Sequence, residues 1–423
     1  MNVHIASHTV GYNAHVKSLC PLDEDSVTRY CTSLVMWHAA DMDTLELLYF
    51  DAGGGHRAAA TALQAVLERE DTGRVHLTSL QQVLDPIDPV RRLTGKRLEE
   101  LYNLLLRRGW TRGSEQLLAP LHAAIRYYHP EEVSLLEAHW RQTRPSMVVS
   151  VVPQFNRAIS ESLRRANPAV PLVTVLTDFA DFPPHFWIES PEQFYICGTE
   201  RAAGQALALG VAPDRILCTS GMIVHPRFYE APPVCRELER MRFGLHPQMA
   251  TGLVLFGGQG SVAMREVARR LDDSGLDVQL ILLCGRNQAL ADDLRAEASR
   301  CARVVLGFTT EIPYYMQLAD FFVGKPGPGC LSEALLMKLP VIVERNASTM
   351  PQERYNVEWV LEKKVGLAVK SFRQVATAVE RLLRPGVLDD YRARVAALEN
   401  RAVYEIPGLL RQVRERCAVA LAS

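Results

Sequence analysis

Three features are absent from the 423-residue sequence, and each absence excludes a class of protein. The nine cysteines form no CxxC pair, so their spacing indicates neither a zinc site nor a disulfide framework. No apolar run reaches the roughly 18 to 20 residues that span a bilayer, and the N-terminus shows no signal-peptide core. The formal net charge is -1 and only 7% of residues are aromatic, so nothing points to nucleic acid. We expect a cytoplasmic protein whose contact with membranes, if any, is peripheral.

The remaining composition is that of an ordinary globular protein, with 48% hydrophobic and 22% charged residues. The length exceeds what one hydrophobic core usually serves, which predicts two domains. Residues 1–41 show no sustained helical or strand period, and we expect a disordered extension there. Their histidines and cysteines match no ligand spacing that would indicate a metal site.

Short apolar runs alternate with longer amphipathic stretches from Leu45 onward, which is the pattern of parallel strands joined by crossover helices. The first series of expected strands is 45–50, 75–79, 147–152, 172–177 and 194–197. The second series is 253–256, 278–284, 304–306, 321–323 and 341–343.

The alternation lapses between Gly221 and Ala250, where four prolines surround a charged stretch, so the linker is expected there. We predict an N-terminal domain over residues 42–235, a C-terminal domain over 250–400, and a last helix within 401–423. Both domains are expected to be α/β and doubly wound. Two such domains facing each other leave a cleft at the carboxyl ends of their strands, where these folds bind ligands.

A glycine loop follows the first expected strand and ends in Gly54, Gly55 and His56, where a helix is expected to begin. The free N–H groups and positive dipole of a helix start favour an anionic or polar ligand. A dinucleotide-binding turn is disfavoured, because the spacing is not GxGxxG and the next strand ends without an acidic residue. With a pKa near neutrality, His56 is a candidate general base, and a helix-capping role is the alternative.

The second series contains a set of residues suited to a nucleotide sugar. Glycine loops after two strands would present backbone amides to a diphosphate, an acidic residue would hold ribose hydroxyls, and a later polar cluster would bind the sugar. The residues concerned are Gly257, Gly258, Gln259, Gly327, Pro328, Gly329, Ser332, Glu333, Gln352 and Glu353. Tight strand-to-helix turns and a helix-start acid are the structural alternatives.

In this order, the motifs resemble one glycosyltransferase group. It contains plant monogalactosyldiacylglycerol synthase, bacterial processive diacylglycerol glucosyltransferases and the lipid-linked N-acetylglucosaminyltransferase of peptidoglycan synthesis. The resemblance covers roughly Leu45 to Phe372 and also includes Thr177-Asp178-Phe179 with Trp187, and Gly307-Phe308. It implies a GT-B fold and an inverting, metal-independent hexosyltransferase without cofactor, which transfers from a UDP-sugar to a lipid, with diacylglycerol as the expected acceptor.

The resemblance also implies roles for individual residues. His56 would deprotonate the acceptor hydroxyl, with Gly54, Gly55, Asp178 and Trp187 on the acceptor side. Glu333 would hold the ribose, and Gly258 and Gly329 would lie by the diphosphate. The sugar would contact Gln352 and Glu353, and the uracil would contact Gly307 and Phe308.

Two departures from the family pattern lie on the acceptor side. Val152 stands where the diacylglycerol enzymes often place a histidine before a proline, and His225 stands where they usually have an arginine. These changes leave the identity of the acceptor open. A UDP-sugar epimerase of the same fold and a non-catalytic sugar-nucleotide-binding regulator are the alternative functions.

A basic segment over residues 91–112 carries seven arginines and lysines among leucines, a tyrosine and Trp110. Basic residues beside an apolar face can dock on anionic lipid. We therefore expect peripheral contact with a membrane surface, at the inner face of the plasma membrane. A solvated helix packed on its own domain is the alternative.

Overall fold

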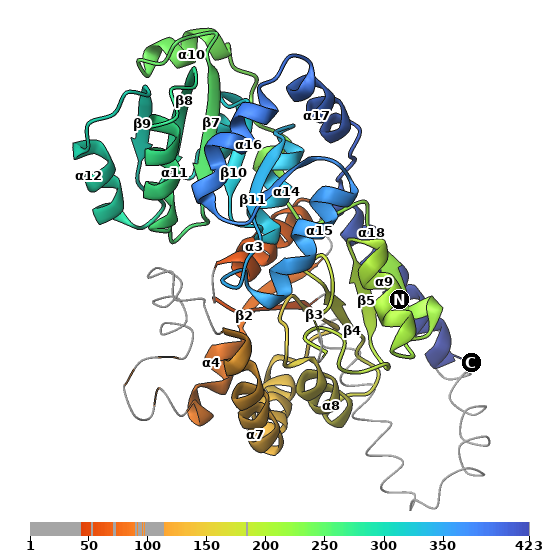
Figure 1. Cartoon of the computed structure of the whole chain (residues 1–423). Helices are drawn as coiled ribbons and strands as arrows, with labels where there is room; N and C mark the ends of the chain where they lie inside the picture. Colours follow the sequence, from red (N-terminus) through yellow and green to blue (C-terminus); the bar gives the residue numbers. More distant parts are fainter. Residues whose placement is uncertain are drawn as a thin grey trace, which may run out of the picture. The chain divides into compact units, whose positions relative to one another are not determined.

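The computed structural model describes residues 44–51, 54–70, 73–88, 91, 95, 97, 114–182 and 185–422. The predicted extension, Gly53 and most of the basic segment 91–112 lie outside the described residues. Thr44–Ser423 form one compact unit that contains two parallel sheets (Figure 1).

The first sheet has six parallel strands in the order β2-β1-β3-β4-β5-β6. Its inner strands are apolar runs whose side chains are buried, as expected for a sheet covered on both faces. The strands are β1 (Thr44–Tyr49), β2 (Arg74–Ser79), β3 (Met147–Ser150), β4 (Leu172–Val175), β5 (Phe194–Cys197) and β6 (Ile216–Cys218).

The second sheet also has six parallel strands, in the order β12-β11-β10-β7-β8-β9. The predicted doubly wound α/β fold is therefore confirmed. The strands are β7 (Ala250–Leu255), β8 (Val278–Leu283), β9 (Arg303–Leu306), β10 (Phe321–Gly324), β11 (Val341–Glu344) and β12 (Gly366–Val369).

Helices connect the strands and cover the sheets. Those of the first half and the last helix are α3 (Gly55–Arg69), α4 (Leu80–Leu84), α7 (Ser114–Thr143), α8 (Asn156–Ala166), α9 (Glu200–Ala208) and α18 (Ala402–Ala422). Those of the second half are α10 (Arg236–Arg242), α11 (Ala263–Asp272), α12 (Gln288–Ala296), α13 (Ile312–Gln317), α14 (Pro328–Leu336), α15 (Arg354–Glu362), α16 (Val375–Leu382) and α17 (Val387–Ala396). Among the described helices, none is both long and apolar enough to cross a bilayer.

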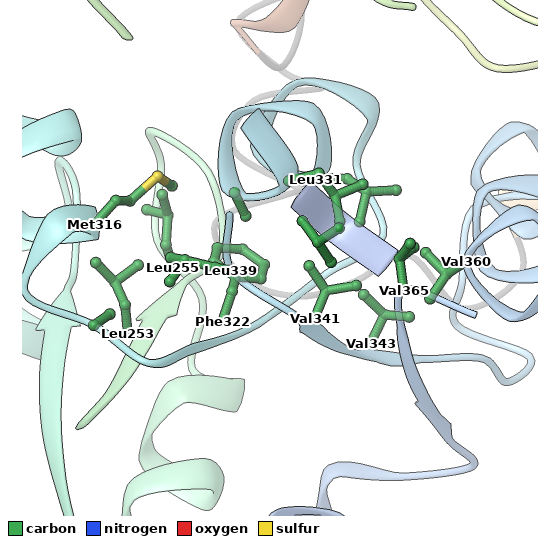
Figure 2. Packing of buried hydrophobic residues seen from close by; sticks show 14 of the residues in the cluster. Leu253, Leu255, Met316, Phe322, Leu331, Leu339, Val341, Val343, Val360 and Val365 are labelled. Carbon is green, nitrogen blue, oxygen red and sulfur yellow. The ribbon is translucent and has the colours of Figure 1, made fainter. Parts of the chain in front are cut away.

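The second sheet has an apolar core on each face. One core joins the sheet to α11, α12 and α16, and the other joins it to α13, α14 and α15. Figure 2 shows part of the latter, where Leu253 lies near Met316 of α13 at one end of the cluster and Val365 lies near Val360 of α15 at the other. The same cluster contains Phe179 and Phe228 from the first half, so the two sheets are joined by apolar packing.

The last helix returns to the first sheet. Ile406, Leu410 and Val413 of α18 are buried in the core that contains Leu45 of β1 and Leu63 of α3. The chain therefore ends on the sheet with which its described part begins.

The charged stretch expected in the linker is a helix bound to the second sheet. Arg240 of α10 is buried and donates to Asp320, while Arg236 and Arg392 pair with the same carboxylate. Asp320 also accepts from the backbone N–H of Thr251 at 2.7 Å. Sequence spacing did not reveal this, because Asp320 lies about eighty residues from the arginines of α10.

Candidate functional site

A cavity of about 530 Å³ lies at the carboxyl ends of both sheets. Loops after β1, β4 and β6 line it on one side, and loops after β7, β8, β9, β10 and β11 line it on the other. Its size is typical of a small-molecule site. Most of the predicted site residues meet there, namely Gly54, Gly55, His56, Asp178, Gly257, Gly258, Gln259, Gly307, Phe308, Gly327, Pro328, Gly329, Glu333, Gln352 and Glu353.

Two predicted site residues do not line this cavity. Trp187 is fully buried behind it, where the indole Nε1–H donates to Asp178 Oδ2 at 2.9 Å. Ser332 lies on the other face of α14, is buried, and lines a second cavity. Successive residues of an α-helix point about 100° apart, so Ser332 faces the second cavity while Glu333 faces the donor side.

His56 stands in the first turn of α3, where Gly54 takes a left-handed conformation with φ of 82°. The imidazole Nδ1 lies 3.1 Å from Thr177 Oγ1, and its ring centroid is 5.8 Å from that of Trp187. Burial lowers the pKa of His56 to about 4, while a hydrogen bond to the Val151 backbone opposes that shift. The side chain is therefore neutral near pH 7 and can accept a proton.

Gly258 and Gly329 leave the backbone open to the cavity. A Cβ at either position would meet no protein atom within 4 Å. By contrast, a Cβ at Gly260 would lie 2.2 Å from the carbonyl oxygen of Cys284. Packing thus requires Gly260, whereas Gly258 and Gly329 suit a ligand that approaches the backbone closely.

Two helices begin at the cavity without a side-chain cap. The first is α3, preceded by Gly54, and the second is α14, preceded by Gly327. The two helices contact each other. Their uncapped N–H groups and positive dipole ends make this part of the cavity suited to an anion such as a diphosphate.

Two carboxyl groups at the cavity have raised pKa values. Burial raises the pKa of Glu333 to about 7, against the opposing charge of Arg227. Burial also raises the pKa of Asp178 to about 7, although the hydrogen bond from Trp187 lowers it. Both groups are therefore partly ionised at neutral pH.

Four cationic side chains line the cavity that were not among the predicted site residues, namely Arg57, Arg227, Arg286 and Lys325. Lys325 donates from Nζ to Glu353 Oε1 at 3.1 Å, and Arg286 lies 5.1 Å from the ring centroid of Phe308. Arg227 has a buried Nε with no hydrogen-bond partner in the described structure. Lys325 and Arg286 each follow closely on the end of a strand, and this position in the sequence could have identified them as site residues.

The basic segment is described at only a few positions. Arg91 and Arg97 both pair with Asp85, and Arg97 is 2.7 Å from its carboxylate. The other basic residues of the segment lie outside the described residues, as does Trp110. Within the part of the chain that is described, no three His, Cys, Asp or Glu side chains are grouped to hold a metal ion.

Comparisons with curated proteins identify homologues, although no protein-family model matches the chain. It is 29% identical over 355 residues to a probable monogalactosyldiacylglycerol synthase 2, chloroplastic, of Oryza sativa subsp. japonica, covering 79% of this chain and 72% of that protein. It is 28% identical over 357 residues to the chloroplastic monogalactosyldiacylglycerol synthase of Spinacia oleracea, covering 80% and 66% of the two chains. The predicted resemblance is confirmed.

Solved structures identify the fold. MurG of Acinetobacter baumannii matches with a TM-score of 0.52 and 12% identity, over 87% of this chain and 99% of that one. UDP-GlcNAc 2-epimerase from Neisseria meningitidis, bound to UDP-GlcNAc, matches with a TM-score of 0.54 and 13% identity, over 87% and 100%. The predicted GT-B arrangement is confirmed.

Proposed function

We propose that this homologue of monogalactosyldiacylglycerol synthases is an inverting glycosyltransferase that moves a hexose from a UDP-sugar to a lipid acceptor. The expected acceptor is diacylglycerol. One observation carries the proposal: a single cavity places a neutral His56 from the first half opposite the uncapped start of α14 and Glu333 from the second half. These are a base for the acceptor and a site for a nucleoside diphosphate.

The reaction needs a proton acceptor on the acceptor side. We assign this role to Nε2 of His56, in the tautomer that carries the ring hydrogen on Nδ1, which lies 3.1 Å from Thr177 Oγ1. The acceptor oxygen then forms a bond to the anomeric carbon while the bond from that carbon to the diphosphate oxygen breaks. Attack from the face opposite the leaving group inverts the anomeric centre.

The leaving group carries the charge that develops in this step. Backbone N–H groups at the start of α14, with Arg227 and Arg286 at the cavity wall, stabilise the departing diphosphate. Glu333 accepts from the ribose hydroxyls, and Gln352 and Glu353 bind the hexose. The ring of Phe308 is 58% exposed and can stack on the uracil. The proposed chemistry uses these protein groups without a metal ion or a cofactor.

The decisive experiment incubates purified protein with UDP-galactose, UDP-glucose or UDP-N-acetylglucosamine and diacylglycerol vesicles, followed by mass spectrometry of the lipids. Formation of a diacylglycerol-linked hexose is the expected result. The proposal fails if no donor yields a lipid-linked hexose while an unrelated acceptor is glycosylated.

A UDP-sugar epimerase is the second candidate, because one matching structure is a UDP-GlcNAc 2-epimerase. That enzyme class needs no acceptor. Incubation of the protein with UDP-N-acetylglucosamine alone separates the two functions. Conversion of the donor without vesicles would favour the epimerase.

The basic segment 91–112 is proposed to hold the protein on an anionic membrane surface, at the inner face of the plasma membrane. Arg91 and Arg97 pair with Asp85, and of the other five basic residues we choose Arg107, Arg108 and Arg112 for the test. Wild type is expected to sediment with phosphatidylglycerol vesicles, and a variant with glutamine at these three positions is expected to sediment less. Equal sedimentation of both proteins would contradict this part of the proposal.

A further inference from the structure

Two glycines, Gly257 and Gly327, border the space that the Lys325 side chain occupies. A Cβ at Gly327 would lie 3.0 Å from Lys325 Cε and 3.3 Å from Glu353 Oε1. At Gly257, a Cβ would lie 3.8 Å from the same Lys325 carbon. The two glycine loops therefore leave a channel through which the lysine side chain reaches Glu353.

The ion pair in this channel faces the cavity. The Glu353 side chain is 9% exposed and the Lys325 side chain is 35% exposed, and both residues line the cavity. An ammonium has three N–H donors and a carboxylate accepts several hydrogen bonds, so the contact at 3.1 Å uses only part of their capacity. Adjacent donor and acceptor groups suit the vicinal hydroxyls of a sugar ring.

Asp178 reaches the same place from the first half. It is buried at the cavity wall after β4, and it is held from behind by Trp187. The charges of Glu353 and Lys325 act on it in opposite directions, the former raising and the latter lowering its pKa. All three charged side chains also line the same cavity, Asp178 after β4 and the ion pair after β10 and β11, so they form one cluster with members from both sides.

We propose that Lys325 and Asp178 complete the hexose subsite around Glu353, so that the transferred sugar is held from both halves of the molecule at once. Lys325 donates to a ring hydroxyl while it keeps Glu353 in position, and Asp178 accepts from a hydroxyl on the opposite face. This inference rests on the proposed function, and it assigns to the cluster the discrimination between a UDP-hexose and UDP.

The first test compares the binding of UDP and UDP-galactose by titration calorimetry in the absence of acceptor, with UDP-glucose measured in parallel. The variants are compared with the UDP-hexose that wild type binds more tightly. Lys325→Met and Asp178→Asn are each expected to bind it at least about tenfold more weakly than wild type does, because each loses a hydrogen bond that involves a charged group. Affinity for UDP is expected to stay within about twofold, since UDP lacks the sugar. Equal weakening of both ligands, or weakening of neither, would overturn the inference.

The second test disturbs the cluster without removing a charge. Gly327→Ala keeps a backbone conformation that alanine adopts, with φ of -66°, but its Cβ presses on the Lys325–Glu353 pair. We expect UDP-hexose affinity to fall by a larger factor than UDP affinity, because Gly327 also precedes the start of α14 at the proposed diphosphate site. Gly204→Ala is the matched control, since a Cβ there meets nothing within 4 Å and Gly204 lies on α9 away from the cavity.

Two further measurements separate the possible failures. If Lys325→Met lowers the melting temperature, the Lys325→Met/Glu353→Gln pair removes the unpaired buried charge, and the same selective loss is still expected. If wild type selects UDP-hexose through this cluster but transfers hexose to no acceptor, the proposed function is wrong and the proposed hexose subsite is retained. If wild type transfers hexose while Lys325→Met keeps full UDP-hexose affinity, the proposed hexose subsite is wrong.

Discussion

The environment of His56 decides which chemistry this residue can perform. Burial keeps the imidazole neutral, and Thr177 orients one ring nitrogen. A histidine that only capped a helix would not need to lie at the junction of two glycine-rich loops and a cavity. The same argument applies to Glu333, which is half-buried at the cavity wall without an ion pair in the described structure.

Replacement of the base is predicted to affect turnover and not donor binding. For His56→Ala we expect about a hundredfold or greater loss of kcat, as is typical for removal of a general base. Affinity for UDP, measured by calorimetry, should be unchanged. His76→Ala, at an exposed histidine of β2, is the control. Normal turnover by His56→Ala would show that another group takes the proton.

Protonation of Glu333 is predicted to make nucleoside binding depend on pH. The ionised carboxylate is the better acceptor for ribose hydroxyls, and burial raises its pKa to about 7. Uridine affinity should therefore rise between pH 6 and pH 8, by up to about tenfold for a single group with this pKa. Titration calorimetry at several pH values measures the affinity for uridine. Glu333→Gln should bind uridine more weakly and lose this rise; a rise that persists in the variant would assign the titration elsewhere.

At the scale of elements, Asp320 joins α10 and α17 to the second sheet. It lies just before β10, is buried, and receives Arg236, Arg240 and Arg392. Burial raises its pKa, but the two arginines of α10 outweigh burial, so the pKa is held below its usual value. The network explains why a polar, proline-flanked stretch folds as a fixed helix.

Asp320→Asn is predicted to lower the free energy of unfolding by about 3 kcal/mol near pH 7, because it leaves the buried Arg240 without its counter-ion. Urea denaturation measures the difference. A carboxyl with a lowered folded pKa stabilises fully above its unfolded pKa, about 3.9, and loses this contribution as the pH falls through the folded pKa. The gap between wild type and variant should therefore be constant from pH 6 to 8 and should shrink below about pH 4. A gap independent of pH would contradict the assignment.

Apolar character explains which strands the sequence identified. The apolar runs of β1, β3, β8 and β10 predicted buried parallel strands. The edge strands β6 and β12 were missed, because Ile216–Cys218 is too short to show a period and Gly366–Val369 begins with glycine. Their assignment depends on pairing with β5 and β11, which are distant contacts.

For the whole molecule, the decisive feature is that apolar packing continues between the sheets. Phe179 of the first half lies against Trp359 of α15, with ring centroids 4.9 Å apart, and Phe228 belongs to the same core. The cavity is also lined by loops from both sheets, so a ligand bound there would contact both.

UDP is therefore predicted to raise the midpoint of one cooperative thermal transition. At a concentration one hundred times its Kd, UDP should add about 2.7 kcal/mol to the free energy of unfolding. Scanning calorimetry with and without UDP measures this. Uridine at the same ratio to its own Kd is the control and should give the same stabilisation. Two transitions, only one of them responsive, would show that the halves unfold separately.

The sequence alone determined the alternation of strands and helices, the glycine loops, and the order of motifs that resembles a glycosyltransferase group. These are local patterns, since apolar period, glycine spacing and strand ends act over a few residues. The tertiary structure decided which residues share a site. It directed Ser332 away from the cavity, placed Trp187 behind Asp178, and brought Lys325 between two glycines to Glu353. Burial, charge and pKa follow from contacts between residues far apart in the chain, which no local pattern encodes.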